Sequence, residues 1–119
     1  MQVLEQQKLN TVLNNFVAEC RTVFGAKLSD VRLFGSYARG DYNEESDIDV
    51  MIILDMSDAD VRKSRHDICH IAAMLELKYG VTISPVLYGK DEYDVRKTFG
   101  FCKNVEMEGV SQCVGQAYE

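Results

Sequence analysis

The chain has 119 residues, of which 46% are hydrophobic and 27% are charged, and its 13 basic and 19 acidic residues give a net charge of −6. This length predicts a single domain over residues 1–119, with room for a core but none for a separate acceptor-binding domain. No apolar run is long enough to span a membrane, and the N-terminus lacks the apolar centre of a signal peptide, so we expect a cytoplasmic protein. The acidic balance disfavours an extended nucleic-acid partner.

The first predicted element is an amphipathic helix from Val3 to Phe24. Apolar residues recur in it at three- and four-residue steps, namely Leu9, Val12, Leu13, Phe16, Val17, Cys20, Val23 and Phe24. Gly25 is a natural stop for this helix. We interpret the stripe as a surface that packs against a sheet, with a membrane or partner surface as the alternative.

A short β-favouring run, Val31 to Phe34, ends at Gly35 and Ser36. This pair suits a tight turn that leads into the first turn of a helix, with Ser36 as the N-cap. A helix N-terminus entered through a glycine exposes backbone N–H groups without a Cβ in the way of a bulky anion. The turn therefore predicts a phosphate site, although a strand followed by Gly-Ser is also a common plain turn.

Three side chains after this turn are candidates for contacts with the same ligand. Arg39 follows Ser36 by three residues, where a short helix would bring it back toward the anion; the alternative is a surface arginine paired with Asp41 or Glu44. Tyr37 and Tyr42 could stack on a base, or could simply cover the edge of the core.

The run from Asp47 to Leu54 has the β-branched and apolar content of a buried strand. Side chains alternate along a strand, so Asp47 and Asp49 point to the same face, roughly 6.6 Å apart. Two carboxylates this close to a core are unfavourable unless a cation compensates them, which suggests Mg²⁺. The alternative is the solvated edge of a loop.

A second helix is predicted from about Asp60 to Tyr79, with Ser57 as a cap and Gly80 as its end. His66 and His70 have the spacing of metal ligands, but helical periodicity places both on the polar face. We interpret them as a solvated pair and keep a zinc site as the weaker alternative.

The four cysteines are far apart in the sequence and form no C-x-x-C pair: Cys20, Cys69, Cys102 and Cys113. This spacing favours reduced core or surface residues over a zinc site or a disulfide framework.

A third strand is predicted from Val81 to Leu87, with Thr82 and Ser84 on one face and Pro85 as the mark of an edge. Charged and apolar residues then predict short helices that begin near Lys90 and near Gly100. The segment from Gly109 to Cys113 is expected to return as a short edge strand.

These motifs, taken together, resemble the DNA polymerase β-like nucleotidyltransferases, and the small size resembles their minimal, antitoxin-type branch. The resemblance rests on Gly35-Ser36, ten intervening residues, and then Asp47-x-Asp49, in the family's order of elements. It implies an α/β fold (α+β) with a small mixed β-sheet and helices packed on one face. The family's third carboxylate is expected near Thr82, where this sequence offers only hydroxyls.

The resemblance implies Mg²⁺-dependent transfer of a nucleoside monophosphate, AMP from ATP in the simplest case, to a protein or small-molecule acceptor. Asp47 and Asp49 would hold one or two Mg²⁺ ions, and the nucleotide would lie on Gly35, Ser36, Arg39 and Thr82. It also implies a HEPN-type toxin as the partner and acceptor. A nucleotidyltransferase domain that has lost catalysis and only binds a nucleotide or a partner is the alternative. The oligomeric state, including a homo-oligomer, stays open.

Overall fold

The computed structural model describes residues 2–113. Along the chain, the elements are α1 (Gln2–Phe24), η1 (Gly25–Lys27), β1 (Leu28–Phe34), α2 (Ser36–Arg39), β2 (Ile48–Leu54), α3 (Asp58–Tyr79), β3 (Ile83–Gly89), α4 (Lys90–Arg96), α5 (Gly100–Glu108) and β4 (Val110–Ser111). Every helix and strand predicted from the sequence is present in this order, and the bounds differ by a few residues.

The four strands form one mixed sheet in the order β3-β2-β1-β4. β1 pairs antiparallel with β2 and with β4, whereas β2 pairs parallel with β3 through the α3 crossover. β3 is therefore an edge strand, as Pro85 predicted, and β4 is the short edge strand expected from the C-terminal segment. The α/β class and the mixed sheet are confirmed.

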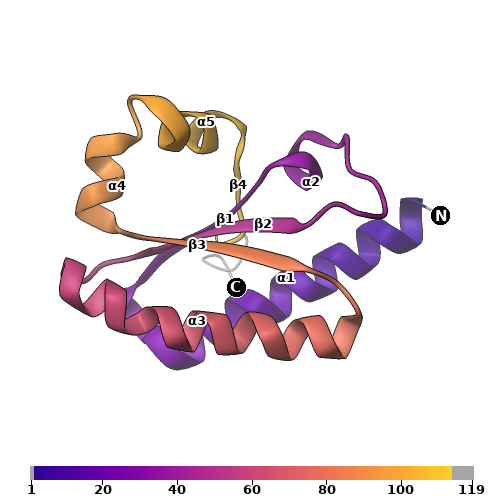
Figure 1. Cartoon of the computed structure of the whole chain (residues 1–119), viewed down its shortest axis with the longest axis horizontal. Coiled ribbons are helices and arrows are strands. Elements are labelled where there is room, and N and C mark those ends of the chain that lie inside the picture. Colours follow the sequence, from indigo (N-terminus) through magenta and orange to yellow (C-terminus); the bar gives the residue numbers. More distant parts are fainter. Residues whose placement is uncertain (1, 114–119) are drawn as a thin grey trace.

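The two long helices, α1 and α3, lie side by side on one face of the sheet (Figure 1). Alternate residues of β2 point into the core between the sheet and these helices: Ile48, Val50, Ile52 and Leu54. This packing explains the apolar stripe of α1, in which Val12, Phe16 and Val17 are fully buried. The expected packing of helices on one face holds for these two helices.

The other face of the sheet is covered in part by α4 and α5 (Figure 1). Met51 and Ile53 of β2 pack there against Tyr93 of α4 and against Cys102 and Val105 of α5. Asp49 is on this second face, because it is two residues from Met51 in the same strand.

The predicted cap and end of α3 are confirmed. The Ser57 side chain caps α3 by accepting from the Asp60 N–H at 3.2 Å, and Gly80 ends the helix in the left-handed conformation. His66 and His70 are exposed on the polar face of α3. All four cysteines are free, and only Cys69 is exposed. No helix in residues 2–113 has the length and apolarity needed to cross a membrane.

Candidate functional site

The strand β1 runs directly into a glycine turn that faces the acidic strand. Gly35 has φ +76° and ψ −155°, a backbone conformation that is essentially restricted to glycine. A Cβ at Gly35 would overlap the Asp49 carboxylate and would lie 3.1 Å from its Cγ. The pairing of Phe34 with Asp49 in the β1–β2 ladder produces this contact. Two motifs that are separate in the sequence therefore form one site.

The helix α2 begins one residue earlier than the sequence suggested, so the predicted capping role of Ser36 is wrong. Gly35 is the N-cap, and no side chain caps this helix. The Gly35 carbonyl accepts from the N–H groups of Ala38 and Arg39, at 3.1 and 3.0 Å. Ser36 is the first residue of this helix and is half-buried at the turn. Backbone N–H groups in the first turn of a helix have no partner within the helix. This arrangement leaves the turn open to an anion.

Arg39 lies at the same turn. It lines a groove of about 380 Å³ together with Gly35, Ser36 and Asp49. Its guanidinium forms ion pairs with Asp41 at 3.3 Å and with Glu108 at 3.8 Å. The sequence predicted Asp41 or Glu44 as alternative partners, and the structure has Asp41. The side chain is 47% exposed, so these pairs are weak and can be exchanged for a phosphate.

The two aspartates are two residues apart in the chain, and their environments differ. Asp47 precedes β2 and is exposed, whereas Asp49 lies within the strand and is half-buried. Burial raises the pKa of Asp49, the negative charge of Asp47 raises it further, and the charge of Arg39 acts in the opposite direction. The two carboxylates therefore destabilise each other in the absence of a cation.

This environment fits a divalent metal, because a cation at Asp47 and Asp49 relieves both the desolvation and the repulsion. Within residues 2–113, no group of three or more His, Cys, Asp or Glu side chains is placed to hold a metal ion. A metal at the two aspartates therefore needs further oxygen ligands from water or from a phosphate, as is usual for Mg²⁺.

The far wall of the groove comes from α5, which the sequence did not indicate as part of the site. Phe101, Asn104 and Glu108 line the groove from that helix. The Arg32 side chain holds the end of α5 by donating to the carbonyls of Glu106 and Gly109, at 3.2 and 2.9 Å. No local motif indicates this wall, because it depends on pairing between segments more than sixty residues apart.

The hydroxyls of the third strand flank the aspartates. Ser84 pairs with Asp49 in the parallel register between β2 and β3, and it is half-buried. Thr82 precedes β3, is exposed, and its carbonyl accepts from the Ile48 N–H at 2.8 Å. Ser84, rather than Thr82, is thus the closest counterpart of Asp49 on the neighbouring strand.

Asp91 and Glu92 are too far away to replace a carboxylate on β3. They follow Gly89, which pairs with Leu54 at the opposite end of the sheet, and they border a separate hollow beside Met56. Leu54 is five residue steps along the strand from Asp49, which corresponds to roughly 16 Å.

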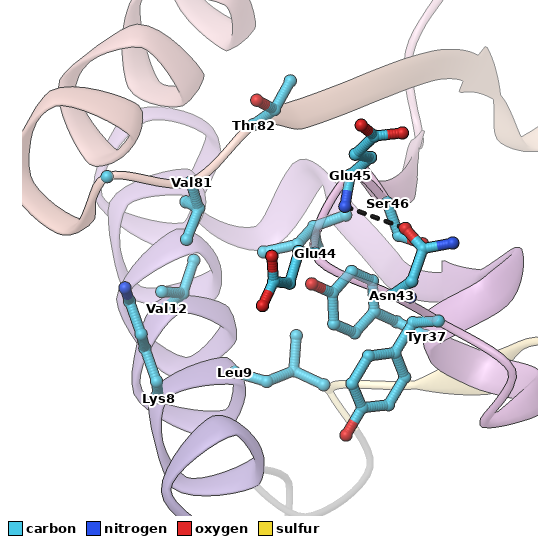
Figure 2. A pocket seen from close by; sticks show the side chains of 13 residues that line it. Lys8, Leu9, Val12, Tyr37, Asn43, Glu44, Glu45, Ser46, Val81 and Thr82 are labelled. Carbon is cyan, nitrogen blue, oxygen red and sulfur yellow. Dashed lines mark hydrogen bonds between the residues drawn. The ribbon is translucent and has the colours of Figure 1, made fainter. Parts of the chain in front are cut away.

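The two tyrosines stack on each other, with ring centroids 4.4 Å apart and an angle of 13° between their planes. Tyr37 and Tyr42 line a cavity of about 310 Å³ beside α1, where Figure 2 labels Tyr37. Neither tyrosine lines the groove at Asp49. Their predicted contact with a base at the phosphate turn has no support in this arrangement.

Comparison with known proteins agrees with the geometry. A family model described as a nucleotidyltransferase domain matches residues 13–107. Two similar proteins of Methanocaldococcus jannaschii carry the names "Putative protein adenylyltransferase MJ0141" and "Putative protein adenylyltransferase MJ0604". The first is 43% identical over 79 residues, which cover 66% of this chain and 78% of the relative. The second is 35% identical over 97 residues, which cover 82% of this chain and 90% of the relative.

Two solved structures share the fold. A mutant of the toxin–antitoxin pair MntA-HpeT has a TM-score of 0.52 at 16% identity, over 83% of this chain and 70% of that chain. A toxin–antitoxin structure with AMP-PNP has a TM-score of 0.51 at 20% identity, over 82% of this chain and 69% of that chain. At these identities the likeness is one of fold.

Proposed function

The chain belongs to the nucleotidyltransferase domain family, and from this membership we propose that it transfers AMP from ATP to a hydroxyl group of a partner protein. The proposed reaction depends on Mg²⁺. Its site is the groove lined by the Gly35 turn, Asp49 and α5, together with Asp47, which lies two residues before Asp49 in the chain.

The contact between Gly35 and Asp49 is the single observation that carries this proposal. It supports a site in which the backbone that receives phosphate oxygens lies directly against a carboxylate that can hold a metal. The triphosphate of a nucleotide is the ligand that needs both groups at this spacing, because its phosphates bind backbone N–H groups and the metal at the same time.

Each residue of the site has a definite role in this reaction. Gly35 and Ser36 bind the β- and γ-phosphates through backbone N–H groups and a hydroxyl, while Arg39 leaves its carboxylate partners to neutralise the phosphates. Asp47 and Asp49 would hold one or two Mg²⁺ ions at the start of β2. When bound, Mg²⁺ supplies charge neutralisation for the triphosphate and for the leaving pyrophosphate.

The proposed acceptor is a partner protein, and the family resemblance points to a toxin of the HEPN type. Two lines of support are the protein adenylyltransferase names of the relatives and the toxin–antitoxin complexes among the structures with the same fold. The proposal also places the reaction in the cytoplasm, where ATP is available and free cysteines stay reduced.

A second function is favoured by one observation. Ser84 and Thr82 offer hydroxyls where a third carboxylate would help to activate the acceptor. A domain of this kind could bind ATP and a partner without transferring AMP. The two functions differ in whether a covalent product forms.

Transfer of radiolabel from ATP separates these functions. The wild-type protein, expressed with the product of the neighbouring gene and purified as a complex, is incubated with Mg²⁺ and ATP labelled at either the α- or the γ-phosphate. AMP transfer predicts protein-bound label from α-labelled ATP only, and loss of that label in the Asp49→Asn variant. Label from γ-labelled ATP, or none from either, would refute AMP transfer.

A further inference from the structure

Figure 2 shows a cavity beside α1. Its lining shares no residue with the groove described above. Its floor is apolar and consists of Leu9 and Val12 of α1, Ile48 of β2 and Val81. The segment 42–46 and the stacked tyrosines form a second wall. A cavity of about 310 Å³ with an apolar floor and a few polar groups at its rim has the size and lining of a site for a small ligand or for one large side chain.

The arrangement of the strands fixes the direction from which an acceptor must arrive. The phosphate turn follows β1, the aspartates lie on β2, and β3 is on the far side of β2. In phosphoryl transfer the attacking and leaving oxygens lie roughly in line. With the β- and γ-phosphates at Gly35, pyrophosphate leaves toward β1, and the attacking hydroxyl enters from the side of β3.

The cavity opens on that same side. Ser46 and Thr82, which immediately precede Asp47 and β3, belong to its rim. Ile48 points into the cavity from one face of the sheet, while Asp47 and Asp49 belong to the other face. An acceptor anchored in the cavity therefore reaches the aspartates by crossing the end of the sheet between Ser46 and Thr82.

The charge at the rim indicates what the acceptor carries. Figure 2 shows the Glu44 side chain pointing into the space between α1 and Tyr37, and Glu45 and Lys8 also line the cavity. Glu44 is exposed, and no ion pair involving it occurs within the described part of the chain. The lining carries one basic side chain, Lys8, and two acidic ones, Glu44 and Glu45, so its net charge is negative and favours a basic group on the ligand.

We propose that this cavity is the acceptor-binding site: it takes an apolar side chain of the acceptor polypeptide, and Glu44 pairs with a lysine or arginine beside that side chain. This inference rests on the proposed function, since it is the AMP-transfer reaction that requires an acceptor on this side. It adds a recognition rule for the acceptor, namely an apolar anchor next to a basic residue and close to the modified hydroxyl.

Peptide binding tests this rule without knowledge of the natural acceptor. The probes are short peptides that carry a leucine, phenylalanine or tyrosine next to a lysine, and a matched set in which glutamate replaces the lysine. One anchor and one ion pair support an affinity on the order of 1 mM, so binding is followed by amide chemical-shift changes. The lysine peptides are expected to shift residues 42–48 and 80–82 selectively and to bind about tenfold more tightly than the glutamate peptides.

Two variants and one matched control locate the interaction. Val81→Phe should fill the cavity and abolish the shifts, and Glu44→Lys should reverse the preference between the two peptide sets. Glu19→Lys changes the net charge equally at an exposed residue of α1 that does not line the cavity, so it should keep the wild-type preference. Unchanged binding in both Val81→Phe and Glu44→Lys, the same change of preference in Glu19→Lys as in Glu44→Lys, or no shifts with any peptide would overturn the proposal.

Calorimetry with ATP and Mg²⁺ keeps this inference distinct from the proposed function. The Glu44→Lys variant should bind ATP with unchanged affinity. A wild-type protein that binds the peptides but not ATP would leave the cavity as a peptide site and remove the transfer reaction. ATP binding without any peptide binding would leave the nucleotide site in place and exclude the cavity as the acceptor-binding site.

Discussion

Gly35→Val is expected to abolish the binding of ATP with Mg²⁺ and to lower the stability of the fold. The backbone conformation at φ +76° costs a residue with a side chain about 1–3 kcal/mol. In addition, the new Cβ would displace the Asp49 carboxylate and would occupy the space where phosphate oxygens approach the backbone. We expect ATP affinity to fall by at least about 100-fold, as measured by calorimetry on protein that thermal melting shows to be folded.

Gly25→Ala is the matched control for backbone strain. Gly25 has φ +56°, but the position that a Cβ would take there has no neighbouring atom within 4 Å, and the residue lies at the end of α1, away from the groove. The substitution should lower stability by about 1–2 kcal/mol and leave ATP affinity unchanged. Equal ATP affinity in folded Gly35→Val and wild type would mean that the turn does not bind phosphate.

Ser84→Asp is expected to increase AMP transfer by about 10²–10⁴-fold, with a much smaller effect on ATP affinity. Ser84 pairs with Asp49 in the parallel register, so a carboxylate there would lie beside Asp49 on the same face of the sheet. It would help to hold the metal on the acceptor side and could accept the proton of the attacking hydroxyl. A serine hydroxyl is far too weak a base for this task at neutral pH.

Pyrophosphate release by the complex with the partner protein measures this effect, and Ser84→Asn is the control that keeps the size of the new side chain without its charge. Ser84→Asn should leave the rate near that of the wild type. An aspartate that leaves the rate unchanged or lowers it would show that another group, from the acceptor or from α5, already acts as the base.

The sequence predicted the part of this site that depends on local pattern. The Gly35-Ser36 turn and the alternation of Asp47 and Asp49 follow from turn chemistry and strand periodicity. Their approach to each other needed the pairing of β1 with β2, which the family resemblance supplied and residue patterns alone did not. The sequence predicts the family's third carboxylate position near Thr82, whereas the residue that pairs with Asp49 in the β2–β3 register is Ser84.

The rest of the site depends on contacts between distant segments, which a single sequence does not encode in any local pattern. Glu108 reaches Arg39 because Arg32 and the β1–β4 pairing hold the end of α5 over the groove. The stacking of Tyr37 on Tyr42 likewise depends on the path of the segment that connects α2 to β2. A long side chain such as Arg39 can be assigned to a face from its position, but its partners cannot be chosen without the neighbouring elements.

Titration calorimetry of the wild-type protein with ATP, in Mg²⁺ and in EDTA, tests the central claim that the Gly35 turn and the two aspartates form one site for a metal–nucleotide complex. Without a metal, the triphosphate would face two uncompensated carboxylates, so binding should be detected with Mg²⁺ and lost in EDTA. Asp49→Asn should weaken the dependence on Mg²⁺. Equal affinity of the wild-type protein for ATP in Mg²⁺ and in EDTA would contradict the assignment of Asp47 and Asp49 as metal ligands.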